Sequence, residues 1–325
     1  MPQPTSSQVH VDAVLTNISL AYEQEADNFI AGKVFPTVPV EKQSDKYFTY
    51  TKNDWFRDEA QVRADGDESV GSGYGISTSP YYCDVYAIHK DIGDQTRKNA
   101  DSPINVDSEA AKFVTQRLLV RREIQFVTDY MTTSVWGTDM TGVSASATAG
   151  QTIQWNDYTN SDPIDDIEDG KAGILSVTGM EANTLVLGYD VFRSLKNHPD
   201  LVDRIKYTSS QTITADMLAA MFDIERVIVA KAVKATNAEG ATAAYSFAVG
   251  KNALLCHVAS EPGLLTPSAG YIFEWTGVSD GMGETIGTSS FYIDEKKSTR
   301  VEAEKAWDNK VVATDLGYFF ATIVA

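Results

Sequence analysis

The chain has 325 residues, of which 43% are hydrophobic and 10% are aromatic, and this composition excludes a disordered chain. Its 27 Lys and Arg residues and 45 Asp and Glu residues give a net charge of -18, which argues against a nucleic-acid-binding module because phosphates are held by clustered basic side chains. The only cysteines are Cys83 and Cys256, so a disulfide scaffold is excluded and buried free thiols are expected.

The sequence predicts neither a secretory signal peptide nor a membrane-spanning segment. The first residues lack the positively charged start and the apolar core of a signal peptide. The longest apolar stretches, such as 253–259 and 317–325, are far shorter than a membrane span. The sequence therefore predicts a soluble intracellular product.

Residues 1–40 are predicted to form a weakly structured arm with one short helix over 12–22. Pro36 and Pro39 impose extended geometry on their neighbours and cannot both donate hydrogen bonds to a central ladder. The apolar side chains of residues 29–40 cannot form a core by themselves. We expect them to dock on another surface, either of the same chain or of a neighbouring chain.

Two strands with a long connection are predicted after the arm. Residues 46–56 are rich in aromatic and Thr residues, and a return strand follows over 81–92, in which Cys83, Val85 and Ala87 share one side. The connection over 57–75 is charged and then rich in glycine. Because an isolated hairpin buries little surface, an extended loop is expected. Its mixed charge fits either a surface that meets neighbours or a solvated loop.

Residues 107–133 predict a long helix with Asp107 as its N-cap. Its apolar residues recur at spacings of 7, 4, 3 and 4, which predicts that one face is buried and consists of Phe113, Val120, Ile124, Val127 and Met131. A helix of this length extends about 40 Å and is expected to be the structural axis of a domain. Its basic and acidic residues balance, so it is not predicted to be a basic recognition helix.

Residues 137–160 are rich in small and polar residues and predict a linker or exposed loop. An α/β region follows. A helix is predicted to begin at Pro163, followed by a strand, two helices and three strands over 184–187, 189–196, 214–222, 226–230, 245–249 and 253–258. The chain ends in β-rich runs over 289–307 and 310–324, with a tight turn predicted at Asp308 and Asn309.

The sequence contains only weak matches to catalytic, nucleotide-binding and metal-binding motifs. Gly277 to Gly281 matches the pattern of a nucleophile elbow around Ser279, but that elbow requires a helix directly after the serine, and glycines follow here. The glycines at 71, 73 and 75 lack dinucleotide-binding spacing, the four histidines lack zinc spacing, and residues 65–68 lack the ligand spacing of a calcium loop. No catalytic, cofactor or metal site is predicted, and the chain is not expected to be an enzyme.

Three segments near the start carry a resemblance to a known family: Phe29-Ile-Ala-Gly-Lys-Val-Phe-Pro-Thr-Val-Pro-Val, Gln43-Ser-Asp-Lys-Tyr and Trp55-Phe-Arg-Asp-Glu-Ala. They resemble the opening of the major capsid proteins of tailed bacteriophages. The order of the predicted elements is similar to the HK97-like fold of that family, an α+β fold. The sequence motifs lie in the first 70 residues, whereas the rest of the chain matches by element order.

The resemblance implies four parts: an N-terminal arm over 1–40, an extended β-hairpin loop over 41–82, a peripheral domain over 83–149 and 289–325 with its spine helix over 107–133, and an axial α/β domain over 150–288. The C-terminal strands would return to the sheet of the peripheral domain, with a last piece in the axial domain left open. Contacts between subunits are expected in the arm and the loop, at Phe29, Phe35, Trp55, Phe56, Arg57, Asp58, Glu59 and Arg63.

The function that the resemblance implies is that of a major capsid protein. Such a subunit self-assembles as hexamers and pentamers into the icosahedral head shell that encloses the double-stranded DNA genome of a phage. It would be found in the virion after assembly in the host cytoplasm, and it would enclose DNA without reading its sequence. Its partners would be its own copies, a portal, decoration proteins and a scaffolding protein. Because this sequence starts almost directly at the arm, the scaffold is either a separate protein, which Met1 favours, or an extension already removed by processing.

Two other functions stay open at this stage. An encapsulin-like shell that stores an enzyme cargo would share the fold, and its cargo would distinguish it from a phage head. A serine hydrolase that uses Ser279 is the alternative from another class, and loss of activity on Ser279→Ala would be its signature.

Overall fold

The computed structural model describes residues 23–325 except for 51, 101–103, 206–212, 264 and 279–285. A five-stranded sheet contains β1 (Thr37–Val40), β4 (Asp84–Gly93), β12 (Gly270–Trp275), β13 (Gly287–Ile293) and β14 (Ser298–Val311). Its strand order is β1-β12-β14-β13, and β4 pairs with β14. The β1 strand pairs parallel with β12 at one edge, which is where a strand that contains Pro39 is tolerated.

A six-stranded sheet contains β5 (Thr138–Val143), β6 (Gln151–Ile153), β7 (Thr184–Gly188), β8 (Arg226–Ala230), β11 (Ala253–Cys256) and β15 (Gly317–Ala321). Its order is β6-β5-β15-β11-β7-β8. The helices that pack against it are α5 (Pro163–Thr178), α6 (Tyr189–Lys196) and α8 (Ala215–Met221), and α7 (Pro199–Ile205) packs on α6. The chain is therefore a mixture of helix and sheet, as the predicted α+β class requires.

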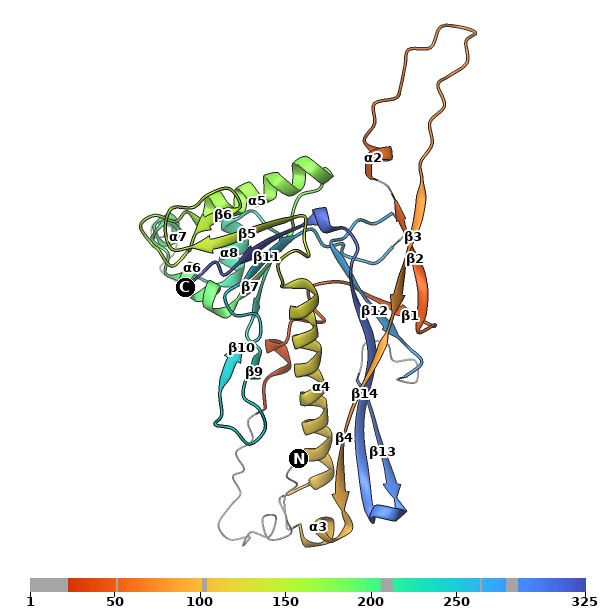
Figure 1. Cartoon of the computed structure of the whole chain (residues 1–325), viewed down its shortest axis with the longest axis vertical. Coiled ribbons are helices and arrows are strands. Elements are labelled where there is room, and N and C mark those ends of the chain that lie inside the picture. The colour runs from red at the N-terminus through yellow and green to blue at the C-terminus, as the bar shows by residue number, and fades with distance from the viewer. Residues whose placement is uncertain (1–22, 51, 101–103, 206–212, 264, 279–285) are drawn as a thin grey trace.

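Two strand pairs stand apart from these sheets. The β2 strand (Ser44–Tyr50) pairs with β3 (Ile76–Tyr82), and β9 (Val233–Ala235) pairs with β10 (Tyr245–Phe247). The molecule is elongated (Figure 1): α4 (Val106–Tyr130) runs beside the long strands β4 and β14, and α3 (Asp94–Asn99) lies at the far end of this shaft. The six-stranded sheet lies beside the other end, and the loop between β2 and β3, which begins with α2 (Lys52–Trp55), projects beyond it.

The long helix exists, but its buried face differs from the predicted one. The side chain of Asn105 caps α4 by accepting a hydrogen bond from the backbone N–H of Ser108, so the helix begins earlier than predicted. Its buried residues are Ala110, Val114, Leu118, Glu123, Phe126 and Tyr130. Phe113, expected to be buried, is exposed beneath the guanidinium of Arg117. Met131 is buried as predicted, and Val120 and Val127 pack partly buried against the core. The prediction was wrong for Phe113 because small, aromatic and charged residues make up most of the buried face, which hides its apolar period.

The return strand is divided between two sheets. Up to Tyr82 the chain pairs with β2, whereas beyond Cys83 it forms β4 and pairs with β14. The residues on the inner side of β4 are Tyr86 and Ile88, which pack against the core, while Val85 is exposed. The predicted alternation of Val85 and Ala87 with Tyr86 and Ile88 is therefore present in β4, but the single return strand predicted over 81–92 is two strands because the chain changes partner at Cys83.

The turn predicted at Asp308 and Asn309 is also wrong. The β14 strand runs without interruption through both residues, which pair with Phe273 and Ile272 of β12. Each polar side chain has a partner that suits the extended strand: Asp308 accepts a hydrogen bond from the backbone N–H of Tyr82 at 2.8 Å, and Asn309 donates to Asp129. Long-range pairing therefore overrides the local turn preference of Asp-Asn.

Sheet membership differs from the expected domain ranges at two strands. The β12 strand lies within 150–288 but pairs with β14, and β5 lies within 83–149 but belongs to the six-stranded sheet. The β15 strand, the last piece of the chain whose place the sequence left open, also belongs to the six-stranded sheet. Residues 137–160 accordingly contribute β5 and β6 rather than a simple linker. Because strands are assigned to sheets by pairing between distant segments, no local composition shift marks these crossings.

Several local predictions are confirmed. The α5 helix begins at Pro163, and the side chain of Asp162 accepts hydrogen bonds from the backbone N–H groups of Ile164 and Asp165. The α6 helix has the predicted bounds, and Thr214 caps α8. Cys83 and Cys256 are buried free thiols, and burial raises the pKa of each to about 12. The predicted helix over 12–22 lies outside the described residues.

Candidate assembly surface

The loop between β2 and β3 is the most exposed part of the described chain. After α2 it forms no further helix or strand until β3, and residues 60–75 are all exposed. Figure 1 shows that it stands clear of both sheets. A segment of this length that buries almost none of its own surface is suited to contact another molecule rather than to stabilise its own fold.

The base of the loop is fixed by an aromatic cluster. The ring of Trp55 lies 5.4 Å from that of Tyr74, and the ring of Tyr50 lies 6.5 Å and 6.2 Å from these two, measured between ring centroids. Asp54 also accepts a hydrogen bond from the backbone N–H of Gly75 at 3.0 Å. The loop therefore leaves the body from a defined base.

Six of the residues predicted to contact other subunits lie on this loop. Trp55 and Phe56 are 53% and 60% exposed, and their neighbours in the set, Arg57, Asp58, Glu59 and Arg63, lie at or near the surface. Within the loop, Arg57 pairs with Glu59 at 3.6 Å, and Ser72 donates a hydrogen bond to Glu59. The contacts of these six residues with other subunits stay a prediction.

The two arm residues of that predicted set are a different case. Phe29 and Phe35 are only 6% and 2% exposed because they are buried in their own chain. The ring of Phe35 lies 4.5 Å from that of Tyr130 and 6.2 Å from that of Phe126 on α4, and Phe29 packs with Ala232. The side chains of Phe29 and Phe35 are therefore not free to contact a neighbour, and the arm residues from 29 onward dock on the same chain.

A buried carboxylate on α4 holds the arm. One oxygen of Glu123 accepts hydrogen bonds from the backbone N–H groups of Ile30 and Ala31, each at 3.0 Å, while its other oxygen has no partner. Burial raises the pKa of Glu123 to about 7, and the two N–H donors and Arg122 only partly oppose this shift.

Next to it, three more charged residues connect the helix and the sheet. Glu274 of β12 forms ion pairs with Arg122 of α4 and with Lys305 of β14, the latter at 2.9 Å. Glu274 and Lys305 are 1% and 2% exposed. These residues join α4 to both strands. None of these residues was predicted from the sequence, although a charged residue at an inward position of an alternating strand is a signal for such a site.

A groove lies between the loop base and the body of the molecule, and we call it the loop-base groove. Its volume is about 980 Å³. Its lining is mostly apolar and comes from segments far apart in the sequence: Val38, Tyr47–Tyr50, Lys52, Trp55, Phe56, Thr178–Met180, Pro262, Gly263, Leu265–Pro267, Tyr271, Phe273 and Val312–Leu316. Among these residues only Lys52 and Asp315 are charged, and they form an ion pair with each other.

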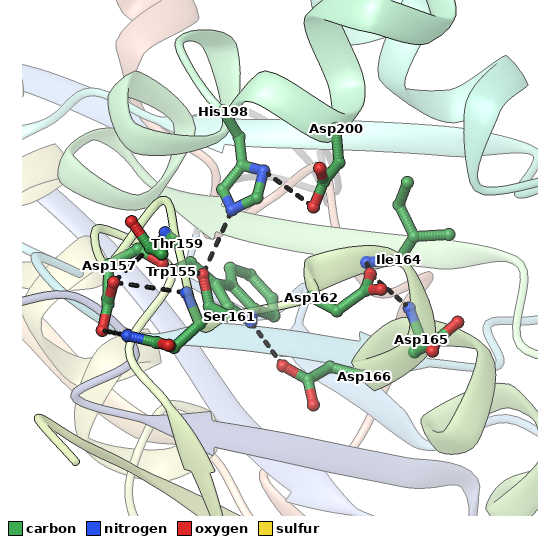
Figure 2. A network of polar contacts seen from close by, with 11 residues as sticks. Trp155, Asp157, Thr159, Ser161, Asp162, Ile164, Asp165, Asp166, His198 and Asp200 are labelled. Atoms are coloured by element: carbon green, nitrogen blue, oxygen red, sulfur yellow. Dashed lines mark hydrogen bonds and ion pairs between the residues drawn. The ribbon is translucent and has the colours of Figure 1, made fainter.

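Ser161, His198 and Asp200 lie in a Ser-His-Asp arrangement near the start of α5 (Figure 2). His198 Nε2 lies 3.1 Å from Ser161 Oγ, and its Nδ1 lies 3.6 Å from Asp200. However, the hydroxyl of Ser161 donates to the carbonyl oxygen of Asp157 at 2.7 Å. The nitrogen of His198 that faces Ser161 must therefore carry the proton and donate it, so it cannot act as a base toward this hydroxyl.

Burial supports a structural role for this group. His198 is fully buried, Ser161 is 7% exposed, and burial lowers the pKa of His198. Around them, Asp162 caps α5, and Trp155 Nε1 donates to Asp166 at 2.7 Å (Figure 2). These contacts tie the segment before α5 to the turn between α6 and α7.

The other sequence candidates give no site in the described part of the chain. Ser279 lies outside the described residues. The glycines at 71, 73 and 75 lie on the exposed loop. Among the described residues, no group of His, Cys, Asp and Glu side chains could hold a metal ion, and no helix is long and apolar enough to cross a membrane.

Two curated proteins are similar to this chain over most of its length. The chain is 27% identical over 296 residues to the major capsid protein of Burkholderia phage BcepMu, which covers 87% of this chain and 91% of that protein. It is 24% identical over 330 residues to the major capsid protein of Pseudomonas phage JBD67, with 97% of each covered. No family model matches the chain.

Solved structures identify the fold. A phage-related protein from Bordetella bronchiseptica RB50 matches with a TM-score of 0.68 at 23% identity over 92% of this chain and 93% of its own. The capsid of cyanophage P-SCSP1u matches with a TM-score of 0.64 at 10% identity over 97% and 93%. The SrpI encapsulin of Synechococcus elongatus matches with 0.55 at 10% identity over 96% and 95%. The fold is the HK97-like capsid fold, as predicted.

Proposed function

We infer that this chain is a phage major capsid protein, the subunit from which the shell of a phage head is built. The observation that carries this conclusion is the similarity of nearly the whole chain to two phage proteins of that name, together with the HK97-like fold. Self-assembly into a shell and a location in the virion capsid follow from it.

The finer part of the proposal concerns how the shell is built and what it encloses. We propose that copies assemble as hexamers and pentamers into an icosahedral shell around double-stranded DNA, and that this takes place in the host cytoplasm. The exposed loop supports the first point because it offers a contact that reaches beyond its own subunit. Trp55, Phe56, Arg57, Asp58, Glu59 and Arg63 are proposed to carry contacts between subunits.

The remaining partners are proposed by analogy with the family. A separate scaffolding protein, a portal and decoration proteins would act with the shell. No enzymatic activity is proposed, because both curated relatives are named as major capsid proteins, which are structural.

The net charge of -18 fits a container for DNA. Many phosphate contacts on the wall would oppose release of the genome, whereas an acidic protein makes few of them. We expect free subunits to bind duplex DNA weakly and in a salt-sensitive way. A filter-binding titration measures this, and a submicromolar dissociation constant at physiological salt would contradict it.

An encapsulin-like storage shell is the second candidate, since the SrpI encapsulin shares the fold. The phage proteins are favoured over it because both sequence relatives are phage major capsid proteins. A shell that co-purifies with a protein cargo and without nucleic acid would favour the storage function.

The test is electron microscopy of the chain expressed alone and with its neighbouring genes. Closed polyhedral shells, or hexameric and pentameric rings, are the expected result, and nucleic acid inside shells formed with the neighbouring genes would identify a phage head. Monomers or dimers under every condition would contradict a shell subunit.

A further inference from the structure

We propose that the loop-base groove is the seat of a second copy of this chain in the assembled shell. The inference rests on the proposed function and adds to it a specific receiving surface on the body of the subunit. The partner is identified by its chemistry, which must be apolar, uncharged at the contact and present wherever the shell is present.

The groove presents apolar side chains to solvent. Phe48 and Leu265, which both line it, are 59% and 61% exposed. Leu265 also has a backbone φ of 60°, a left-handed conformation that is costly for a residue with a large side chain. Exposed apolar residues gathered around one hollow, several of them aromatic, are typical of a surface that another protein covers.

The groove is formed before any partner arrives. Its loop wall is fixed by the aromatic cluster of Tyr50, Trp55 and Tyr74, and the ion pair between Lys52 and Asp315 joins this wall to the body. Among the lining residues, the ring of Tyr47 stacks on that of Phe273 with 5.5 Å between centroids. A preformed groove lets a partner bind without first ordering the chain.

The low charge of the groove lining favours a second copy of this chain as the partner. Each copy carries a net charge of -18, so two copies repel each other and their contact must use surface that is poor in unpaired charge. The lining of the groove meets this condition because its two charged residues neutralise each other. The same lining offers no unpaired cation to a nucleic acid phosphate.

The position of the groove at the base of the loop also favours a second copy of this chain. The groove is lined by residues of the loop base, Lys52, Trp55 and Phe56, and by residues of the body. The loop itself continues outward from this base (Figure 1). A neighbouring subunit that contacts the loop near its base therefore meets the groove as part of one continuous surface.

Cysteine labelling tests the proposal directly. The native thiols of Cys83 and Cys256 are buried with raised pKa values, so they contribute little reaction with a polar maleimide. Leu265→Cys and Phe48→Cys each place one accessible thiol at the groove. In free subunits both should react readily, and in assembled shells they should react at least about tenfold more slowly, because labelling depends on access to the thiolate.

Charge substitution provides an independent readout. Leu265→Asp should leave the subunit folded, because the side chain is exposed, but should block or strongly reduce shell formation. Tyr245→Asp is the matched control: it places the same charge at a residue that is 71% exposed on β10, away from the groove, and it should assemble.

The possible outcomes distinguish a failure of the proposed capsid function from a failure of the proposed groove contact. Absence of shells from the unsubstituted chain under every condition would contradict the proposed function itself. Shells in which both groove thiols react as fast as in free subunits would overturn the inference and leave the function intact. Thiols that stay reactive in shells of this chain alone but are protected in whole virions would also overturn it, since another protein would then be the occupant.

Discussion

Glu123 couples the docking of the arm to protonation. Its carboxylate is held by the N–H groups of Ile30 and Ala31, yet burial raises its pKa from 4.5 to about 7. A carboxyl group whose pKa is raised in the folded state binds more protons there than in the unfolded chain. It therefore adds stability that is fully present below about pH 4.5 and is lost as the pH rises through about 7.

Glu123→Gln should remove this dependence. The neutral amide keeps an oxygen that can accept from both N–H groups but has no charge to desolvate. We expect the melting temperature of the variant to exceed that of the parent at about pH 8 and the difference to shrink toward about pH 5. Calorimetry of free subunits across this range measures it. Equal differences at every pH would show that Glu123 does not titrate there.

Glu123→Ala is the matched control for the hydrogen bonds. It leaves the N–H groups of Ile30 and Ala31 without their acceptor in a buried site, and each unpaired group costs about 1–3 kcal/mol. The Ala variant should therefore be less stable than the Gln variant at every pH.

Ser161 allows a structural role to be separated from a catalytic one. Its hydroxyl accepts from His198 and donates to the carbonyl oxygen of Asp157. Ser161→Ala would leave the buried N–H of His198 unpaired, with an expected loss of about 1–3 kcal/mol of stability. A thermal melt should show this loss, and a panel of ester substrates should give equal, background hydrolysis with both proteins. Hydrolysis by the parent that the variant lacks would reveal a catalytic serine.

At the scale of elements, the loop should be dispensable for folding. Residues 60–75 are all exposed, and the polar contacts of Glu59 are made within the loop itself. Replacing residues 57–73 with a short Gly-Ser linker should leave the melting temperature nearly unchanged while shells fail to close. Calorimetry and electron microscopy test the two halves. Normal shells from this variant would contradict the loop assignment.

A smaller deletion distinguishes the effect of loop length from the effect of losing the contact residues. Removing only residues 65–68 at the charged tip shortens the loop slightly and leaves Trp55, Phe56 and Arg63 in place. If these three residues carry the contact, this variant should assemble better than the linker variant.

Elements with local signals were predictable from the sequence. Asp162 and Pro163 fix the start of α5, and Thr214 fixes that of α8, because caps act through residues two or three positions away. Elements decided by distant partners were not. Asp308 and Asn309 have the composition of a turn but continue β14, since β12 supplies their pairing from more than 30 residues earlier.

The residues of the loop and of the loop-base groove also differ in whether they could be predicted from the sequence. Trp55, Phe56 and the charged residues after them were found because they lie in one continuous exposed segment. Leu265 was not found, because the groove that it lines exists only where the loop base meets residues 262, 263, 265–267 and 312–316. Phe35 was assigned outward because apolar residues in a weakly structured arm give no indication of which surface they cover, and α4 covers them here.

For the whole molecule, charge should govern assembly. A net charge of -18 on every copy opposes the approach of subunits, and salt screens this repulsion over about 10 Å at 0.1 M ionic strength. The charge-poor loop-base groove gains nothing from low salt. We therefore expect shell formation by purified subunits to accelerate as NaCl rises from about 0.05 M to about 0.5 M.

Light scattering follows this assembly in time, and sucrose at equal osmolality is the control for effects other than screening. The opposite salt dependence would result if Arg57 and Arg63 on the loop formed ion pairs with acidic side chains of a neighbouring subunit. If such pairs dominated, salt would weaken them and assembly would slow as NaCl rises. Acceleration by NaCl but not by sucrose means that repulsion between whole subunits outweighs ion pairs at their contacts, so the contacts must draw their free energy from apolar surface.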